Sequence, residues 1–529
     1  MQAASASAGQ AATAVLLGPG PVTIEHLLRV AQAGAPVCAT PEVAQRLRIA
    51  RAVVDQLAAS STPIYGLNSA LGANVGQAID PAQQAAYQVR AIQARSVGVG
   101  PEIGVERVRA TLFSRLAGLA VGGSGISPEV FDALLALLNA GVHPVVPALG
   151  SIGVADLAPM SHAMQVLLGA GEADFCGERL PGGEALRRAG LAPAQLGPKD
   201  GLALISSNAF TVGGAALAWQ HMARVLDLLD FAAVLTLEGF RANLSPFCAE
   251  AVAARPTPGV QQSAERLVAL LDGSALWQSG AARRVQDPLS LRCVPQIHGA
   301  AWWALEDARQ HIEAELNGAG DSPLVLPEGA ATEAAQGQGR LISTSNFHIP
   351  GLVLSLEGVG LAFAQAASAV VQRCQRLYSP GSSGLPLQLT RLGPEHSGFA
   401  TIQKTLTALW SEVRHLANPA CLDFFPVSET SEDHALMAPQ VVEKTQRLGD
   451  AVAYLACIEL LSAAQAVDLR GITPDQMGAG ARRIYTAVRA LLPPLDEDRP
   501  LGPEVELLHR HWLAGALPEP GGLEESAAA

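Results

Sequence analysis

The stretch Gly150-Ser-Ile-Gly-Val-Ala-Asp-Leu-Ala-Pro159 is the most informative part of this sequence. Two glycines and a serine in its first half are typical of a loop, and an apolar stretch from Leu157 to Leu168 follows. Asp156 directly precedes that stretch, and aspartate is favoured at the N-terminal cap of a helix because its carboxylate accepts unpaired backbone N–H groups. We therefore predict a glycine-containing loop that ends at the cap of a helix.

Around this loop, Ala- and Leu-rich segments with helical spacing dominate, and alternating β-rich runs are few and short. Three segments run for many turns, from Gly351 to Tyr378, from Phe399 to Ala417 and from Leu436 to Leu469. Helices of this length are typical of a bundle. The most apolar stretch, Ala133 to Ala155, is interrupted by prolines and glycines, so we interpret it as a buried helix and loop and expect no membrane span.

The composition narrows the class of protein. The chain has 529 residues, is 49% hydrophobic and carries a net charge of -13, so it lacks the basic face that nucleic acid requires. Its length calls for several cores or one large helical assembly. The seven cysteines are scattered and never form a Cys-x-x-Cys pair, which indicates a reducing compartment and predicts neither disulfides nor a metal site. The first twenty residues lack the basic region of a signal peptide, so we predict a cytoplasmic protein.

The loop and five further motifs together resemble those of the histidine and phenylalanine ammonia-lyases. The five motifs are Tyr65-Gly-Leu-Asn-Ser69, Lys199-Asp-Gly-Leu-Ala-Leu204, Gln286-Asp-Pro-Leu-Ser-Leu-Arg-Cys293, Ser345-Asn-Phe-His348 and Ser431-Glu-Asp-His434. Each motif alone is weakly specific, but five in the family's order are strongly specific. The resemblance extends from about Val15 to Leu513.

The resemblance implies a mainly α, fumarase/aspartase-like fold with a long central helical bundle and a smaller N-terminal α+β active-site region. Residues 15–210 would form the N-terminal active-site domain, and residues 211–515 would form the bundle and the C-terminal helices. Residues 1–14 and 516–529 are expected to be disordered tails. The family also implies a homotetramer whose active sites are shared between subunits.

The loop departs from the family at the residues that form its cofactor. In the family an Ala-Ser-Gly tripeptide cyclises and loses water, which gives an electrophilic methylidene-imidazolone. Here only Val154 and Ala155 occupy that place, and alanine has no hydroxyl to lose. Ser206-Ser-Asn208 replaces an Asn-Gly-Thr that supports the electrophile, and Leu289 replaces a second family tyrosine. We therefore predict an enzyme that has no cofactor.

Three matched positions carry the expected chemistry. Tyr65 matches the tyrosine of a mobile lid loop that removes the β-proton, and its phenol needs nearby positive charge to act as a base near neutral pH. Arg292 matches the arginine that binds the substrate carboxylate, and Asn346 matches the asparagine that donates a hydrogen bond to the same group. The alternatives are a half-buried turn tyrosine for Tyr65 and, for Arg292, an ion pair with Asp287 or another nearby acid. For Asn346 the alternative is a backbone-capping role.

Other residues would select the substrate. Glu432 matches the glutamate of the histidine-specific branch, where it could pair with a cation, although it could also be an ordinary carboxylate opening a long helix. Arg95 replaces a ring-selecting histidine, and Lys404 lies one helical turn beyond an active-site position of the phenylalanine branch. Both could line the pocket or lie on the surface. Gln286 and Phe347 complete the expected substrate contacts.

An enzyme without a built electrophile needs a substrate that carries its own leaving group, and a quaternary ammonium meets that need. The pattern resembles the ergothionases, relatives of the ammonia-lyases that eliminate trimethylamine from ergothioneine to give thiourocanate. The alternatives are elimination from another betaine such as trimethylated histidine, a conventional histidine or aromatic amino acid ammonia-lyase, and a catalytically inactive paralogue. Retention of Tyr65, Arg292 and Glu432 argues against the inactive paralogue.

Overall fold

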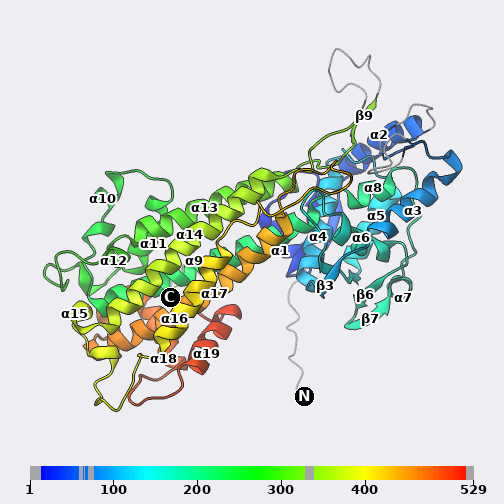
Figure 1. The fold of residues 1–529 in the computed structure, drawn as a ribbon. Coiled ribbons are helices and arrows are strands. Elements are labelled where there is room, and N and C mark those ends of the chain that lie inside the picture. The colour runs from blue at the N-terminus through cyan, green and yellow to red at the C-terminus, as the bar shows by residue number, and fades with distance from the viewer. Residues whose placement is uncertain (1–12, 59–63, 65, 70–76, 328–338, 520–529) are drawn as a thin grey trace. The chain divides into compact units, whose positions relative to one another are not determined.

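The computed structural model describes residues 13–58, 64, 66–69, 77–327 and 339–519 (Figure 1). Over these residues the chain is mainly helical, with short sheets of two or three strands, as predicted. It divides into two compact units. Unit 1 comprises Met1–Leu217, Arg309–Leu354 and Ala420–Val442, and unit 2 comprises Ala218–Ala308, Ser355–Pro419 and Glu443–Ala529.

Four long helices contribute residues to both units. They are α9 (Ala209–Phe240), α13 (Val294–Leu316), α14 (Pro350–Tyr378) and α17 (Ala438–Arg470). The sequence-based division at residues 210 and 211 differs from this one, because unit 1 also takes the segments 309–354 and 420–442.

In unit 1 a buried helix forms the centre. The shorter helices here are α1 (Ile24–Ala31), α2 (Pro41–Ala58), η2 (Pro81–Gln83), α3 (Gln84–Arg95), α4 (Val105–Ala120), α5 (Pro128–Asn139), α6 (Leu157–Leu167), α7 (Gly182–Arg188) and α8 (Asp200–Ile205). Every residue of α4 from Val108 to Ala120 is buried, and α1, α2 and α5 contact it. A helix that is buried on all sides lies in a core.

The strands of unit 1 form four small sheets. The pairs are β1 (Val15–Leu17) with β2 (Val37–Ala39), β3 (Val99–Glu102) with β5 (Pro147–Leu149), and β8 (Leu324–Leu326) with β9 (Arg340–Ile342), while β4 (His143–Pro144), β6 (Glu172–Phe175) and β7 (Glu178–Pro181) form the fourth sheet. Only the β1–β2 pair is parallel. Val99 pairs with Leu149, the residue directly before the glycine-containing loop, so the β3–β5 pair fixes the start of that loop.

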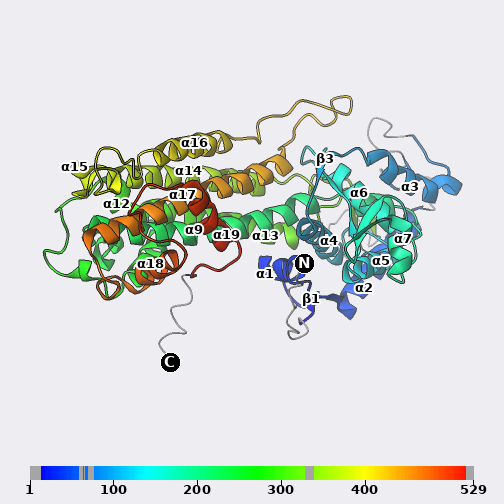
Figure 2. The same cartoon turned by 90° about the horizontal axis from the view of Figure 1, so that it is seen from below.

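Within unit 2 the long helices lie side by side (Figures 1 and 2). Arg373 of α14 forms an ion pair with Glu459 of α17, and both side chains are fully buried. Thr236 of α9 donates a hydrogen bond to Glu459 Oε1 at 2.8 Å. Because both ions and the hydroxyl are paired, this polar centre fixes the register of three helices without leaving a buried charge alone.

The remaining helices of unit 2 are short. They are η3 (Ser245–Phe247), α10 (Ala249–Ala253), α11 (Val260–Leu270), η4 (Ala275–Trp277), α12 (Leu289–Arg292), α15 (Pro380–Ser383), η5 (Leu387–Leu389), α16 (Ile402–Leu416), η6 (Pro474–Gln476), α18 (Ala479–Leu491) and α19 (Gly502–Leu513). The three long helices predicted from the sequence correspond to α14, α16 and α17, and their N-terminal ends differ from the prediction by three residues or fewer.

Three helical stretches are long and apolar enough to cross a membrane by length and composition alone. They are Asp200–Phe240, Pro350–Tyr378 and Ala438–Arg470, and their most apolar windows are 94%, 61% and 83% buried inside the fold. Packing within the chain therefore accounts for most of their apolar surface. The window of α14 is the least buried of the three.

Candidate active site

The loop from Gly150 to Asp156 joins strand β5 to helix α6, and two glycines shape it. Gly150 has a φ of 138° and Gly153 a φ of 81°, in the region that favours glycine. A Cβ atom on Gly153 would lie 2.6 Å from the backbone nitrogen of Ala438. Ala155 has a φ of 50°, which is uncommon for a residue with a side chain. Contacts from outside the loop must therefore hold this backbone in place.

Asp156 provides most of those contacts from a fully buried position. Its Oδ1 accepts hydrogen bonds from the hydroxyls of Ser151 at 2.8 Å and Thr211 at 3.1 Å, and its Oδ2 accepts the Thr211 N–H at 2.8 Å. Burial raises the pKa of this carboxyl, and the hydrogen bonds from Thr211 and Ser151 oppose that rise. Asp156 occupies the predicted N-cap position of α6, but its side chain makes no capping hydrogen bond to that helix. It ties the loop to the start of α9 instead.

The segment 206–208 holds the other side of the loop. Asn208 donates a hydrogen bond from Nδ2 to the carbonyl of Gly153 at 3.2 Å, and the Asp156 N–H donates to the carbonyl of Ser207 at 2.8 Å. This segment stands where the family has Asn-Gly-Thr. An asparagine amide therefore reaches the loop, although it comes from a position two residues later in the chain.

The residues of this loop do not fit the family's cofactor. Val154 and Ala155 carry no hydroxyl that could leave as water. The hydroxyl of Ser151 donates to Asp156 and accepts the N–H of Gly153 at 3.1 Å, so it serves as a hydrogen-bonding group of the loop.

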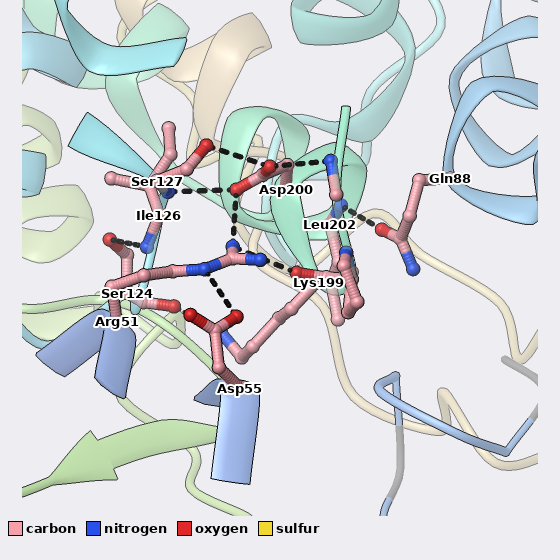
Figure 3. A network of polar contacts seen from close by, with 11 residues as sticks. Arg51, Asp55, Gln88, Ser124, Ile126, Ser127, Lys199, Asp200 and Leu202 are labelled. Carbon is pink, nitrogen blue, oxygen red and sulfur yellow. Dashed lines mark hydrogen bonds and ion pairs between the residues drawn. The ribbon is translucent and has the colours of Figure 1, made fainter. Parts of the chain in front are cut away.

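The Lys199-Asp200 motif builds a buried polar network beside α8 (Figure 3). Asp200 accepts hydrogen bonds from Arg51 at 3.0 Å and from the N–H and hydroxyl of Ser127 at 2.8 Å each. The Lys199 ammonium donates to the carbonyl of Ser124, and burial lowers the pKa of Lys199 to about 8. The network fixes the start of α8, and the end of α8 leads into the segment that holds the loop. Its role is to position the site.

The N-terminal part of the chain contains two of the predicted site residues, Tyr65 and Arg95. Tyr65, the predicted base, lies outside the described residues, and its assignment stays a prediction. Arg95 is half-buried in the last turn of α3 and donates from Nη1 to the carbonyl of Ala91 in its own helix at 3.1 Å. That bond leaves most of its donors free for a ligand.

Asn346 and Phe347 lie in the turn that precedes α14. Asn346 is exposed and donates from Nδ2 to the carbonyl of Ala319 at 3.1 Å, so the backbone-capping role is present in this chain. An amide nitrogen carries two hydrogens, and the second remains for a carboxylate. Phe347 is half-buried beside it in sequence.

Glu432 lies in a turn instead of at a helix start. Its backbone pairs with Val427 in an isolated antiparallel bridge, and its Oε1 accepts the hydroxyl of Ser428 at 2.8 Å. Helix α17 begins only at Ala438, so the alternative of a carboxylate that opens the long helix is wrong. The side chain is half-buried and forms no ion pair within the described part of the chain. A half-buried carboxylate of this kind favours a cationic ligand.

Arg292 ends the short helix α12 and is half-buried. Its Nε is buried without a hydrogen-bond partner, and no ion pair of Arg292 occurs among the residues that the structure describes. Asp287, its proposed alternative partner, accepts the N–H of Asn243 at 2.6 Å. Burial raises the pKa of Asp287, and Arg292 lowers it only as a minor contribution. The Arg292 guanidinium therefore has N–H donors available to bind an anionic ligand such as a carboxylate.

Lys404 and Gln286 belong to unit 2, as does Arg292. Lys404 is exposed on α16 and lines a cavity of about 920 Å³. The polar residues around this cavity include Ser397, Thr401, Thr405, Tyr454, Asp498, Arg499 and Glu506. Neither Arg292 nor Gln286 lines it, and Gln286 is exposed in the segment before α12. Within unit 2, Lys404 and Arg292 thus do not share that cavity.

Sequence reasoning missed a cluster of aromatic rings near Glu432. The rings of His348 and His434 meet edge to face with centroids 5.0 Å apart, and the ring of Phe424 lies 5.7 Å from that of His434. These residues come from two segments far apart in the chain, so no local sequence pattern predicts that their rings are in contact. The histidines in the two motifs were its only signal. Within the described residues no cluster of His, Cys, Asp or Glu could hold a metal ion.

The chain is similar to known proteins over most of its length. The family model described as aromatic amino acid lyase matches residues 22–490. The histidine ammonia-lyase of Gloeobacter violaceus is 38% identical over 502 residues, which cover 94% of this chain and 95% of that protein.

Solved structures of lyases are also similar to this chain over most of its length. A structure of ergothionase from Treponema denticola, described as an ergothioneine-degrading enzyme, is 30% identical with a TM-score of 0.90 and covers 95% of this chain and 99% of that one. Histidine ammonia-lyase from Trypanosoma cruzi is 30% identical with a TM-score of 0.85, over 95% of this chain and 94% of that one. The family model over residues 22–490 and the relatives that cover most of the chain show that it belongs to the aromatic amino acid lyase family.

Proposed function

We propose that this lyase eliminates trimethylamine from ergothioneine and gives thiourocanate, without a protein-derived electrophile. The observation that carries the proposal is the loop at 150–156, whose residues cannot form the family's electrophile and whose serine hydroxyl is engaged with Asp156. A primary amine is a poor leaving group without such activation. A quaternary ammonium departs as a neutral amine and needs none. The likeness to the Treponema denticola enzyme, which degrades ergothioneine, supports this substrate.

The reaction balances with the residues that the chain carries. Tyr65, as its phenolate, takes the proton from the carbon next to the one that bears the ammonium and becomes a phenol, and the C–H electron pair becomes the second bond of a C=C double bond. The C–N bond breaks, and its electron pair leaves with trimethylamine. Arg292 and Asn346 bind the carboxylate, and Glu432 stabilises the ammonium until it departs. Gln286 and Phe347 line the site around them.

Selection of the sulfur-bearing ring would fall to Arg95 and Lys404. The thione of ergothioneine carries partial negative charge on sulfur, and a nearby cation stabilises it. The half-buried Arg95, with only one hydrogen bond to its own helix, suits this role. Lys404 lines a cavity that Arg292 does not line, so in this proposal Lys404 contacts the substrate in a site that another subunit completes.

A direct assay tests the proposal. The purified protein is incubated with ergothioneine, trimethylated histidine and histidine, and trimethylamine, ammonia and the conjugated product are measured. Trimethylamine from ergothioneine is the expected result. Trimethylamine from trimethylated histidine alone would assign another betaine. Ammonia from histidine would contradict the proposal and favour the activity of the histidine ammonia-lyase relatives.

The mass of the intact protein tests the absence of the electrophile separately. Cyclisation and dehydration of a tripeptide remove water, so a chain without the cofactor has the mass of its sequence. We expect that mass, and we expect that borohydride leaves the activity unchanged. A deficit that maps to residues 150–156 would refute the cofactor-less mechanism.

A further inference from the structure

Three aromatic rings form a cluster, two of them on the segment that contains Glu432 and the third on a segment distant in the chain. Phe424 precedes the turn that contains Glu432, His434 follows it, and His348 comes from the turn before α14. The bridge between Val427 and Glu432 closes the turn, so Glu432 lies on the same short segment as Phe424 and His434, and the ring of His348 packs against this segment through His434. All of these residues lie in unit 1.

We propose that His348, His434 and Phe424 form the subsite for the trimethylammonium group, with Glu432 as its counter-ion. This inference rests on the proposed function and specifies how the leaving group is recognised. A trimethylated nitrogen has no N–H, so no hydrogen-bond acceptor can bind it directly. Ring faces and carboxylates are the groups that attract such a cation, and ring cages are the usual solution.

The exposure of the rings favours a ligand site over a packing cluster. His434 is exposed, and Phe424 and His348 are half-buried, whereas rings that only fill a core lose nearly all contact with solvent. The edge-to-face contact of the two histidines, with an interplanar angle of 75°, turns their faces in different directions. Two such faces and a third ring can border a rounded group such as trimethylammonium.

The charge state of His348 is consistent with a cation beside its ring. Burial lowers the pKa of His348, and the neighbouring His434 lowers it further. A neutral imidazole presents a π face to a cation, whereas an imidazolium would repel it. Glu432 has no cationic partner among the described side chains, so its charge is available to the ligand.

The test compares two ligands of the same shape. One is ergothioneine, and the other is its analogue in which a tert-butyl carbon replaces the charged nitrogen. Binding of both is measured by calorimetry to the Tyr65→Phe protein, so that turnover does not interfere. We expect this protein to prefer ergothioneine at least 10-fold, and we expect His434→Leu and Phe424→Leu each to reduce the preference about 3- to 10-fold.

Two further variants control for folding and position. His434→Phe keeps a ring and should retain the preference, which a general loss of structure would not allow. Phe425, the next residue after Phe424, is 77% exposed and forms none of the ring contacts of the described residues, so Phe425→Leu should leave the preference unchanged.

The outcomes separate this subsite from the proposed reaction. If His434→Leu and Phe424→Leu keep the full preference for the charged ligand, the subsite is refuted, even where the protein releases trimethylamine from ergothioneine. If trimethylated histidine and its tert-butyl analogue show the same ring-dependent preference while ergothioneine is not turned over, the subsite stands and the substrate assignment fails.

Discussion

At the scale of single residues, the loop shows how one position controls its neighbours. Asp156 is buried and accepts three hydrogen bonds, and it thereby fixes a backbone in which Ala155 has a positive φ. Its type and its place before α6 could be predicted from the sequence. Its partners could not, because Thr211 lies 55 residues further along the chain. The contact between the rings of His348 and His434 could not be predicted either, because these two residues are also far apart in the chain.

The first prediction concerns the proposed base. Tyr65→Phe removes the phenolic oxygen and keeps the ring, so the proton acceptor is lost while the shape of the lid is preserved. Loss of a general base typically lowers the rate about 100-fold or more. We expect trimethylamine release from ergothioneine to fall by at least that factor, with a dissociation constant close to that of the wild type. Near-normal turnover would remove Tyr65 from the mechanism.

A second prediction at this scale uses a carboxyl group whose pKa burial moves close to neutrality. Glu315 is half-buried in the last turn of α13, and burial raises its pKa to about 7. The folded state then binds the proton more tightly than the unfolded state, whose pKa is about 4.3. The contribution of Glu315 to the free energy of unfolding is therefore fully present below about pH 4, and it is lost as the pH rises through 7. The helix C-terminus adds repulsion with the ionised form.

Glu315→Gln should therefore stabilise the protein at pH 8 and change little at pH 4.5. Because the side chain is partly exposed, we expect about 1 to 2 kcal/mol at the higher pH. Thermal unfolding followed by circular dichroism at both pH values measures the difference. Equal shifts at the two pH values would mean that ionisation of Glu315 is not the cause.

At the scale of elements, helical periodicity predicts α14, α16 and α17, because their apolar residues recur over many turns and their interiors lack proline. Helix α9 is absent from the predicted long helices. Its interior glycines disfavour a helix, yet they permit close packing. A Cβ on Gly213 would lie 2.7 Å from the backbone of Ala110, and a Cβ on Gly239 would lie 2.9 Å from the Ala466 side chain. Tertiary packing here outweighs local propensity.

The glycine loop offers an element-scale prediction with a matched control. Gly153 and Gly177 share a φ of 81°, but a Cβ on Gly153 would meet Ala438, whereas one on Gly177 meets nothing within 4 Å. Gly177→Ala should cost only the backbone strain of about 1 kcal/mol. Gly153→Ala adds steric overlap and should cost about 1 to 3 kcal/mol more. Thermal unfolding midpoints compare the two variants, and equal losses would show that the loop tolerates a shift away from Ala438.

At the scale of the whole molecule, the predicted site residues divide between the two units. Arg292, Gln286 and Lys404 belong to unit 2, and Arg95, Asn346, Phe347 and Glu432 belong to unit 1. The family resemblance implies sites that several subunits share, and this remains a prediction; among the described residues the buried Nε of Arg292 has no hydrogen-bond partner. Sequence motifs identify such residues one by one. They do not reveal which subunit supplies each of them.

The exposed apolar surface of α14 leads to the last prediction. Leu354 and Leu361 are 59% and 53% exposed, and residues seven apart lie on the same face of a helix. An apolar stripe on a helix favours burial against another subunit, and closed symmetric assemblies are the common result. We expect light scattering to give four times the chain mass of 54.6 kDa.

Leu361→Glu should dissociate the assembly, because a charge would be buried in the interface. Leu16→Glu, at a 52% exposed leucine of β1, is the matched control and should leave the assembly intact. Since a shared site is incomplete in one chain, dissociation should abolish trimethylamine release, and a fully active monomer would contradict both the assembly and the shared site.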